Sequence, residues 1–509
     1  MDFNNKIIYQ IYPKSFKDTN GDGIGDLNGI IEKLDYIKDL GTDYIWLSPI
    51  MKSPQNDNGY DISDYYTIDP MFGNNEDYLR LIKEAKKRDL KVMMDLVLNH
   101  TSTSHEWFKR AVSGDMKYQE YYIFRDEPTE LESVFGGDAW KYLPELDKYY
   151  LHMFDETQAD LNWDCEALRN EIYEMINYWI NQGVEGFRLD VIDMIGKNVE
   201  TGEISRTPRF YELLEELNIK TFADKLLTVG ECWGASFEQA QKMCNPKGLT
   251  QLFHFHDTTI TNDEVKWDQK PLDLDALSAL LARWNNSYDG INAWVLGNHD
   301  SPRRLSLWLN DDKYRKESAK LLITLYGFLR GNLYIYQGDE IGMTNAHMHD
   351  IKNYNDVETY NYYNEMKLKG ISDKTTMDKI AVVSRDNARI PMQWNDTDYA
   401  GFSNVEPWLK MYEGYKDINV EKDLEADDSV YRYYQEIIKF RKEHSDIISE
   451  TITFKTNGDI LYFRKDNYVG ILNFSDKISD IQPLGDVVFS NYHNVTHELR
   501  PYECIVFKI

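Results

Sequence analysis

The sequence predicts an α/β fold, a TIM (β/α)8 barrel with a subdomain inserted after the third strand and a C-terminal antiparallel β domain. Three observations lead to it. Short apolar runs rich in Val, Ile and Tyr alternate with helical patterns, and eight such runs occur. One gap between a run and its helix is too long for a loop. Near the C-terminus the helical spacing gives way to short alternating segments. Alternating strands and helices indicate a parallel sheet, and eight strands suit a closed barrel, with an open doubly wound sheet as the rival.

The first strand and helix show the pattern clearly. The run IIYQIY at 7–12 precedes the helical segment 26–41, whose apolar residues recur every three or four positions, and Gly41 suits the helix C-cap. The other predicted strands are 42–49, 91–100, 185–191, 226–231, 250–255, 292–300 and 332–340.

The long gap follows the third strand. That strand ends near His100 and its helix begins only near Cys165, whereas loops in α/β units are usually short. We therefore assign the barrel to 1–100 and 166–447 and the inserted subdomain to 101–165. Residues 448–509, with an NG turn between alternating segments, are assigned to the antiparallel domain.

The charge of the chain excludes several classes of partner. The formal net charge is -29, whereas nucleic acids and acidic membrane surfaces bind clustered Lys and Arg, so neither is expected as a partner. A neutral small molecule is a more suitable partner for so acidic a chain. The four cysteines lack CxxC spacing, which favours free thiols in a reducing compartment. Neither a signal-peptide pattern nor an apolar run of membrane-spanning length is present, so we expect a soluble, cytoplasmic protein.

Acidic residues lie at the ends of three predicted strands. Asp190 ends the fourth strand, Glu231 the fifth and Asp300 the seventh. In a barrel these ends meet at the face that carries active sites. One such acid is explained equally well by bonds to loop amides. Three carboxylates at one mouth repel one another and indicate a use.

The stretch GFRLDVID at 186–193 places a cation beside one of these acids. Side chains alternate along a strand, so Arg188 and Asp190 share a face. A neighbouring cation favours an ionised carboxylate, as a nucleophile requires. Glu231, followed by Cys232 and Trp233, has the dry setting that suits a general acid and base. Two carboxylates in these roles perform glycoside hydrolysis, and Asp300 is available to grip sugar hydroxyls.

At this point the motifs carry a family resemblance. DLVLNH, GFRLDVID, VGE and NHDSPR, in this order on strands three, four, five and seven, resemble the signature regions of the alpha-amylase superfamily, glycoside hydrolase family thirteen. The likeness spans nearly the whole chain and implies the architecture that the spacings predict. It implies a retaining mechanism with Asp190 as nucleophile, Glu231 as general acid and base, and Asp300 as transition-state stabiliser. It also implies that His100, Arg188 and His299 orient the glucose ring and that Tyr60 stacks on it.

Further motifs narrow the likeness to the oligo-1,6-glucosidase and dextran glucosidase branch. They are QIYPKSF, DNGYDISDY, YQGDEIGMTN and NARIPMQW. In that branch residues at the places of Asp61 and Arg389 hold the terminal glucose, which implies exo action. A Val after the nucleophile, here Val191, accompanies α-1,6 preference, whereas Thr accompanies α-1,4. The two side chains have similar shape and differ by a hydroxyl. The other interpretation is that Val191 is simply a good strand residue.

The expected function is therefore an exo-acting retaining α-glucosidase that releases α-1,6-linked glucose from isomaltose, isomalto-oligosaccharides or short dextrans. An α-1,4-glucosidase (maltase), a trehalose-6-phosphate hydrolase and a sucrose isomerase are alternatives. His256 resembles the residue of the trehalose-6-phosphate hydrolases, but the lysine that accompanies it there has no counterpart. Cys232 and Trp233 are nearer the dextran glucosidase form. Non-catalytic amylase-like transporter subunits would lack the carboxylates and carry a membrane helix. We expect no organic cofactor.

The loop DTNGDGIGD predicts a structural metal site. Oxygen ligands recur at alternate positions, from Asp18, Asn20, Asp22, the Ile24 carbonyl and Asp26. The spacing resembles the start of an EF-hand loop without its final bidentate Glu, and a hard cation such as Ca²⁺ suits these ligands. A metal-free, Asx-rich turn is the alternative. The resemblance implies that such an ion is structural.

Overall fold

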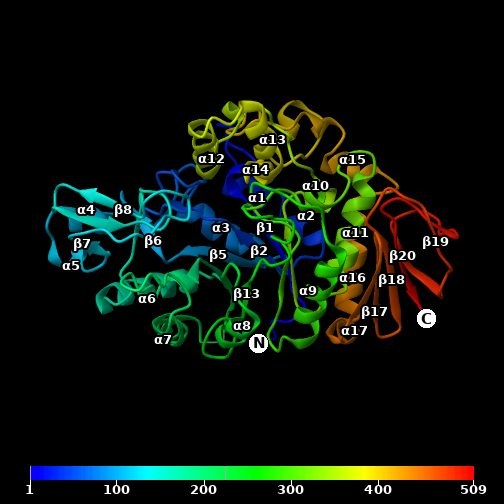
Figure 1. Ribbon diagram of the computed structural model, residues 1–509, viewed down its shortest axis with the longest axis horizontal. Coiled ribbons are helices and arrows are strands. Elements are labelled where there is room, and N and C mark those ends of the chain that lie inside the picture. The colour runs from blue at the N-terminus through cyan, green and yellow to red at the C-terminus, as the bar shows by residue number, and fades with distance from the viewer. Residues whose placement is uncertain (1, 224) are drawn as a thin grey trace. The chain divides into compact units, whose positions relative to one another are not determined.

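The computed structural model of the protein describes residues 2–223 and 225–509 (Figure 1). Contacts divide these residues into two compact units. The first unit comprises Trp46–His254 and Asp356–Asn364. The second comprises Asp2–Ile45, Phe255–Asn355 and Glu365–Ile509.

A parallel sheet forms the centre of the fold. In the described ranges it contains eight strands, in the order β13-β12-β11-β5-β2-β1-β15-β14. Their bounds are β1 (Ile7–Ile11), β2 (Tyr44–Leu47), β5 (Lys91–Val97), β11 (Gly186–Asp190), β12 (Leu227–Glu231), β13 (Gln251–Phe253), β14 (Ala293–Val295) and β15 (Asn332–Tyr336). In the first unit β11 pairs in parallel with β5 and β12, and β12 with β13. In the second unit β15 pairs in parallel with β1 and β14. The predicted parallel strands are confirmed.

Helices alternate with these strands as predicted. They are α1 (Leu27–Glu32), α2 (Leu34–Asp39), α3 (Asn75–Lys86), α6 (Glu166–Asn181), α7 (Pro208–Leu217), α8 (Phe237–Met243), α9 (Leu274–Ser287), α10 (Arg304–Trp308), α11 (Arg315–Gly327) and α16 (Val430–Glu443). Every residue of β1, β2, β11, β12 and β15 is buried. Strands covered on both faces in this way are near-continuous apolar runs, so the few charged residues in them stand out.

Register determines which side chains meet at the ends of the strands. On β11, Arg188 is opposite Asp95 of β5 on one side and Val229 of β12 on the other. Gly230 is opposite Leu189, so Glu231 emerges next to the end of β11. Three neighbouring strands therefore deliver charged side chains to one place.

A segment rich in short strands lies between β5 and α6. It contains β6 (His100–Ser102), α4 (Glu106–Val112), α5 (Met116–Gln119), β7 (Phe124–Arg125), β8 (Trp140–Leu143), β9 (Lys148–Leu151) and β10 (Gln158–Asp160). Strands β7, β9 and β8 form an antiparallel sheet, and Figure 1 shows β7 and β8 with α4 and α5. Trp140, Leu151, Met153 and Met194 form an apolar cluster on which the Val191 side chain packs.

The chain ends in a second antiparallel sheet. Its order is β16-β17-β18-β22-β20, from β16 (Thr453–Asn457), β17 (Ile460–Lys465), β18 (Tyr468–Asn473), β20 (Asp486–Ser490) and β22 (Cys504–Lys508). Figure 1 shows β17, β18 and β20 beside α11 and α16. Phe328, just after α11, contacts both Phe440 of α16 and Phe463 of β17, so aromatic rings join helices and sheet. The predicted C-terminal antiparallel domain is confirmed, and the exact domain boundaries stay predictions.

A polar, Tyr-rich stretch lies between β15 and α16. It contains α12 (Val357–Leu368), α13 (Asp373–Val383), α14 (Asp386–Arg389) and α15 (Val420–Glu425). The short elements that complete the chain are β3 (Met51–Lys52), β4 (Asp64–Ile68), α17 (Ser445–Ser449), β19 (Ser479–Asp480) and β21 (Glu498–Leu499). Within residues 2–223 and 225–509, none of the helices combines the length and apolarity that a membrane crossing needs.

Two local features differ from the predictions. The predicted helix 26–41 is broken at Lys33 (φ -103°, ψ 6°) into α1 and α2, although Gly41 follows α2 with φ 96°, as its C-cap role requires. Val191 is not a strand residue. The strand ends at Asp190, and Val191 has left-handed backbone angles of φ 34° and ψ 42°. These angles are unfavourable for a β-branched side chain, so the turn is a strained one.

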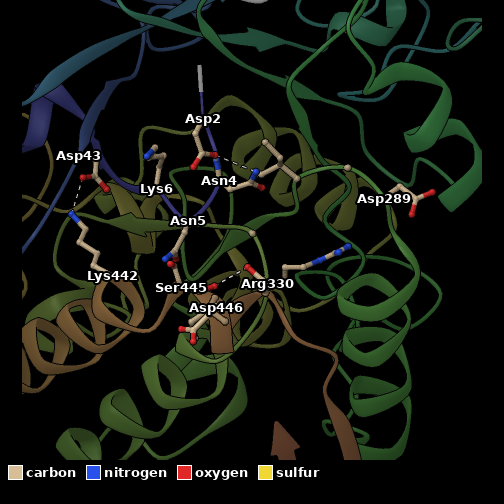
Figure 2. A pocket seen from close by; sticks show the side chains of 15 residues that line it. Asp2, Asn4, Asn5, Lys6, Asp43, Asp289, Arg330, Lys442, Ser445 and Asp446 are labelled. Atoms are coloured by element: carbon tan, nitrogen blue, oxygen red, sulfur yellow. Dashed lines mark hydrogen bonds and ion pairs between the residues drawn. The ribbon is translucent and has the colours of Figure 1, made fainter. Parts of the chain in front are cut away.

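The second unit contains a polar cavity of about 720 Å³ near the start of β1 and β15 (Figure 2). Lys6, Asp43, Arg330 and Lys442 are among its lining residues, and Lys442 pairs with Asp43 at 2.7 Å. It lies at the N-terminal ends of strands, the side of such barrels that serves stability.

Candidate active site

Three strands of the first unit bring a buried charged cluster together at their C-terminal ends. Asp95 lies in β5, Arg188 and Asp190 in β11, and Glu231 ends β12. All four side chains are buried. Buried charges require partners, and here they are partners of one another.

Arg188 is the centre of this cluster. Its Nη1 donates to Asp95 Oδ1 at 2.9 Å and to Asp190 Oδ1 at 2.6 Å. Its Nη2 donates to Glu231 Oε2 at 2.5 Å. One guanidinium fork therefore orients both predicted catalytic carboxylates, which a point charge could not do.

Aromatic rings enclose this guanidinium. Its central carbon lies 5.5 Å from the ring centre of Trp46 and 5.6 Å from that of Tyr60. Trp46 Nε1 and Tyr60 Oη donate to Asp95 Oδ2 at 3.1 and 3.2 Å. Asp95 thus fixes the predicted sugar platform, Tyr60, together with Arg188.

Glu231 accepts two further hydrogen bonds. The indole Nε1 of Trp233 donates to Oε1 at 2.7 Å, and the backbone N–H of Val191 donates to Oε2 at 3.3 Å. Trp233 is 38% exposed, so part of its side chain is open to solvent. The left-handed turn at Val191 directs the backbone N–H of this residue toward Glu231, the predicted general acid.

The buried cluster contains one cation, Arg188, and three carboxylates. Burial raises the pKa of Asp190 well above its usual range; Arg188 opposes this, whereas the charges of Glu231 and Asp95 raise it further. The sequence predicts that Arg188 keeps Asp190 ionised, but in the structure burial and the two neighbouring carboxylates outweigh the effect of Arg188 on the pKa of Asp190.

A second ion pair supports the turn after β11. Burial raises the pKa of Asp193 to about 7, although Arg206 acts to lower it. Arg206 Nη1 donates to Asp193 Oδ2 at 2.5 Å and to the Trp233 carbonyl at 3.1 Å. This pair holds the backbone of the tryptophan that contacts Glu231.

Asp61 and His100 lie in the same unit, Asp61 in the turn between β3 and β4 and His100 at the start of β6. Asp61 is fully buried and accepts bonds from Ser53 Oγ at 2.7 Å and the Asn56 amide at 2.9 Å. Burial raises its pKa, and these bonds oppose the shift. Burial lowers the pKa of His100 to about 4, so the ring is neutral at pH 7. His100 Nε2 lies 3.2 Å from the Tyr60 carbonyl.

The second unit brings the remaining predicted residues together. His299 Nε2 lies 3.0 Å from Asp300 Oδ2. Arg389, on α14, donates from Nη2 to Asp300 Oδ1 at 3.0 Å and from Nε to the His299 carbonyl at 2.9 Å. Arg385 Nη1 also donates to Asp300 Oδ1, at 3.2 Å. Tyr12 stacks on His299 with ring centres 5.8 Å apart.

Asp300 is electrostatically the opposite of Asp190. Burial would raise its pKa, but His299, Arg385 and Arg389 together hold the pKa of Asp300 well below its usual range. Two cations keep this carboxylate ionised, which suits an acceptor for sugar hydroxyls or for developing positive charge.

Two residues at these sites were missed by the sequence analysis. Asp95 is the acid of the quoted motif DLVLNH, and its position in an apolar strand was a signal of the same kind as Asp190. Arg385 precedes Arg389 by four residues, the spacing that places two side chains on one helix face.

The loop 18–26 closes on itself in this structure. Asp18 accepts the amides of Asn20, Gly21 and Gly23 at 3.0, 2.7 and 2.9 Å, and the hydroxyl of Ser403 at 2.5 Å. The all-oxygen donor set fits a hard cation, but these four donors use the lone pairs of Asp18. Over residues 2–223 and 225–509, no group of three or more His, Cys, Asp or Glu is arranged to hold a metal.

Comparison with known proteins identifies the family. The alpha-amylase catalytic domain family matches residues 10–451. The chain belongs to this family and has its fold, a (β/α)8 barrel with a C-terminal antiparallel domain. It is a glycoside hydrolase of family thirteen, as the motifs predicted.

Three relatives show how extensive the similarity is. The glucan 1,6-alpha-glucosidase of Streptococcus pneumoniae is 45% identical over 95% of this chain and 94% of its own length. The oligo-1,6-glucosidase of Bacillus cereus is 40% identical over 99% and 98%. A mutant trehalose-6-phosphate hydrolase of Bacillus licheniformis, a solved structure, superposes with a TM-score of 0.94 at 40% identity, covering 99% of both chains.

Proposed function

We propose that the protein is an exo-acting retaining α-glucosidase that removes terminal α-1,6-linked glucose from isomaltose, isomalto-oligosaccharides or short dextrans. The observation that carries the proposal is the Arg188 fork, which joins Asp190 and Glu231 in one buried cluster. Its substrate class is supported by similarity to the glucan 1,6-alpha-glucosidase and oligo-1,6-glucosidases.

In the proposed reaction, Asp190 attacks the anomeric carbon while Glu231 gives a proton to the leaving glycosidic oxygen. The glucosyl–Asp190 ester that forms is then hydrolysed by a water from which Glu231 takes the proton. The first step needs Asp190 ionised and Glu231 protonated. Arg188 contributes to the first requirement because it lowers the pKa of Asp190 against the effect of burial.

Substrate contacts are assigned to the other residues that the motifs single out. Asp61, Arg389 and Asp300 would accept or donate bonds to the hydroxyls of the terminal glucose, and His100 and His299 would orient it. Tyr60, held by its hydroxyl on Asp95, would stack on the ring. Asp300, kept ionised, would also stabilise the oxocarbenium-like transition state.

The linkage preference rests on Val191. Its backbone contacts Glu231 and its side chain packs on the Trp140 cluster, so it connects the general acid to the inserted segment. A methyl group here offers no hydrogen bond to the leaving sugar, which is the basis of the α-1,6 assignment.

Trehalose-6-phosphate hydrolysis is the second candidate, since the Bacillus subtilis enzyme of that name is 42% identical over 99% of this chain. His256, the residue type shared with that branch, is half-buried, and burial lowers its pKa. A neutral imidazole brings no charge to a phosphate, so the α-1,6-glucosidase is preferred.

The test is turnover of isomaltose, maltose, sucrose and trehalose-6-phosphate by the purified chain, with Asp190→Asn as the inactive control. We expect isomaltose to have the highest kcat/KM. A clear preference for maltose or trehalose-6-phosphate would refute the linkage assignment.

We further propose a structural Ca²⁺ at the loop 18–26, held by Asp18, Asn20, Asp22, Asp26 and the Ile24 carbonyl. The support is the oxygen-only donor set; Asp18 would bind the ion by giving up one of the four hydrogen bonds that it accepts in this structure. No catalytic step uses the ion. The proposal of a cytoplasmic location rests on the sequence alone.

A further inference from the structure

A groove of about 620 Å³ lies in the first unit, outside the charged cluster. Its walls are the β3–β4 hairpin, the turn before α4, and α6; α4 and α6 are labelled in Figure 1. We call it the hairpin groove, and its principal lining residues are Lys52, Tyr65, Tyr66, Ser104, His105 and Trp107. Its volume is within the roughly 300–1,000 Å³ range of ligand pockets.

Aromatic rings line the hairpin groove. Tyr65 packs against His105 and Trp107, with ring centres 5.4 and 5.7 Å apart, and His105 lies 4.5 Å from Trp107. Tyr66 is 39% exposed and contacts Tyr178 in an edge arrangement, which leaves part of its ring uncovered. Such rings present flat apolar faces to the C–H groups of a ligand.

Hydrogen-bonding groups at the same place are unused. Among residues 2–223 and 225–509, the indole N–H of Trp107, the Lys52 ammonium and the hydroxyls of Tyr66 and Ser104 have no partner. Lys52 and Tyr66 are exposed and Ser104 and Trp107 are half-buried, so these hydrogen-bonding groups are open to solvent and to a ligand. Accessible donors beside an aromatic floor suit a polar ligand.

His105 adds a donor of fixed direction. Its Nδ1 accepts the Trp107 amide at 3.1 Å, and burial lowers the pKa of His105 to about 4. The neutral ring therefore carries its proton on Nε2. A neutral histidine adds no charge to the groove.

The charges of the groove favour an uncharged ligand. The lining cations are Lys52 and Lys109, and the lining acids are Asp64, Glu106 and Glu171. With a formal net charge of -29 for the whole chain, an anion is repelled. Aromatic faces together with mixed donors and acceptors match the alternating apolar faces and hydroxyls of a sugar. The cavity of Figure 2 is a useful contrast, because no aromatic side chain of the described residues lines it.

We propose that the hairpin groove is a second, non-catalytic binding site for a short neutral gluco-oligosaccharide. The choice of a glucose oligomer rests on the proposed function. Tyr66 and Trp107 supply the stacking faces, and Lys52, Ser104 and His105 bond the hydroxyls. The site would retain isomalto-oligosaccharides or short dextrans near the enzyme between cleavage events.

The test is calorimetric titration of the 509-residue chain carrying Asp190→Asn with a short isomalto-oligosaccharide, with and without saturating deoxynojirimycin to block the catalytic pocket. We expect a second site that persists with the iminosugar. Tyr66→Ala should weaken this site about tenfold. The matched control is Tyr142→Ala, a tyrosine 45% exposed on β8 that does not line the groove.

Lys52→Ala, which removes no hydrogen bond of the described residues, tests the same site if Tyr66→Ala folds poorly. One site per chain, abolished by the iminosugar, would overturn the proposal, as would a second site that neither variant weakens. Failure of the proposed function is separate, since it appears as absent isomaltose turnover by the wild-type chain.

Discussion

Arg188 Nη1 lies 2.6 Å from Asp190 Oδ1, although only one residue separates the two in the sequence. Strand alternation places them on one face, and the end of β11 leaves both side chains at the mouth of the sheet. The same guanidinium also serves Asp95 and Glu231. We therefore expect the shape of the Arg188 guanidinium to matter more for activity than its charge.

Arg188→Lys should show this directly. A lysine keeps the charge but cannot bridge Asp190 and Glu231 with a rigid fork, so we expect kcat/KM for isomaltose to fall about 100-fold or more. Steady-state kinetics measure the effect, and a thermal melt checks that the variant is folded. Lys422→Arg, an exposed basic position, is the control substitution. Wild-type kcat/KM in a folded Arg188→Lys variant would contradict the role of the fork.

The contacts of this cluster that could be predicted from the sequence are those between residues close together in the chain. The Arg188 and Asp190 pairing follows from alternation, a local rule. The contact of Arg188 with Asp95 needs the register between β11 and β5, which long-range packing sets. The left-handed turn at Val191 could not be predicted, because Val favours strands. The eight strands could be predicted because each is a separate apolar run in the sequence.

Trp233 is expected to influence the general acid. Its indole donates to Glu231 Oε1 at 2.7 Å and so helps to hold this carboxyl in place. In Trp233→Phe the ring remains and the donor is lost, so Glu231 is oriented less firmly and kcat/KM for isomaltose should fall about tenfold. Steady-state kinetics of the two enzymes measure this, and a thermal melt checks that the variant is folded. An unchanged kcat/KM in a folded variant would show that this bond plays no part in catalysis.

Val191→Thr tests the linkage assignment. Both side chains are β-branched, so the strain at φ 34° is the same in each and the comparison isolates one hydroxyl. We expect the ratio of maltose to isomaltose kcat/KM to rise about tenfold, which corresponds to about 1.4 kcal/mol. Val191→Ala is the packing control and should lower stability without changing the ratio. If Thr leaves the ratio constant, linkage preference comes from elsewhere.

Calcium removal tests the loop 18–26. A cation that binds only the folded chain adds about 2.7 kcal/mol when its concentration is 100 times Kd. We expect chelation to lower Tm by a few degrees while isomaltose turnover at 25 °C is retained. Asp22→Ala should abolish the calcium effect on Tm. Identical melting curves with calcium and with chelator would favour the metal-free turn.

His105 should make stability depend on pH. Its pKa is about 4 in the folded chain, because burial disfavours the charged ring, against an ordinary value of 6.5. As the pH falls, His105 therefore binds a proton in the unfolded chain before it does so in the folded chain. The contribution of the neutral His105 to the free energy of unfolding, which is complete above pH 6.5, is lost as the pH falls to 4. Over this window the loss reaches about 3 kcal/mol. Gln does not titrate and can still accept the Trp107 amide. The free energy of unfolding in urea should therefore fall more steeply for the wild type than for His105→Gln between pH 6.5 and pH 4. A constant difference between the two proteins would mean that folding does not lower the pKa of His105.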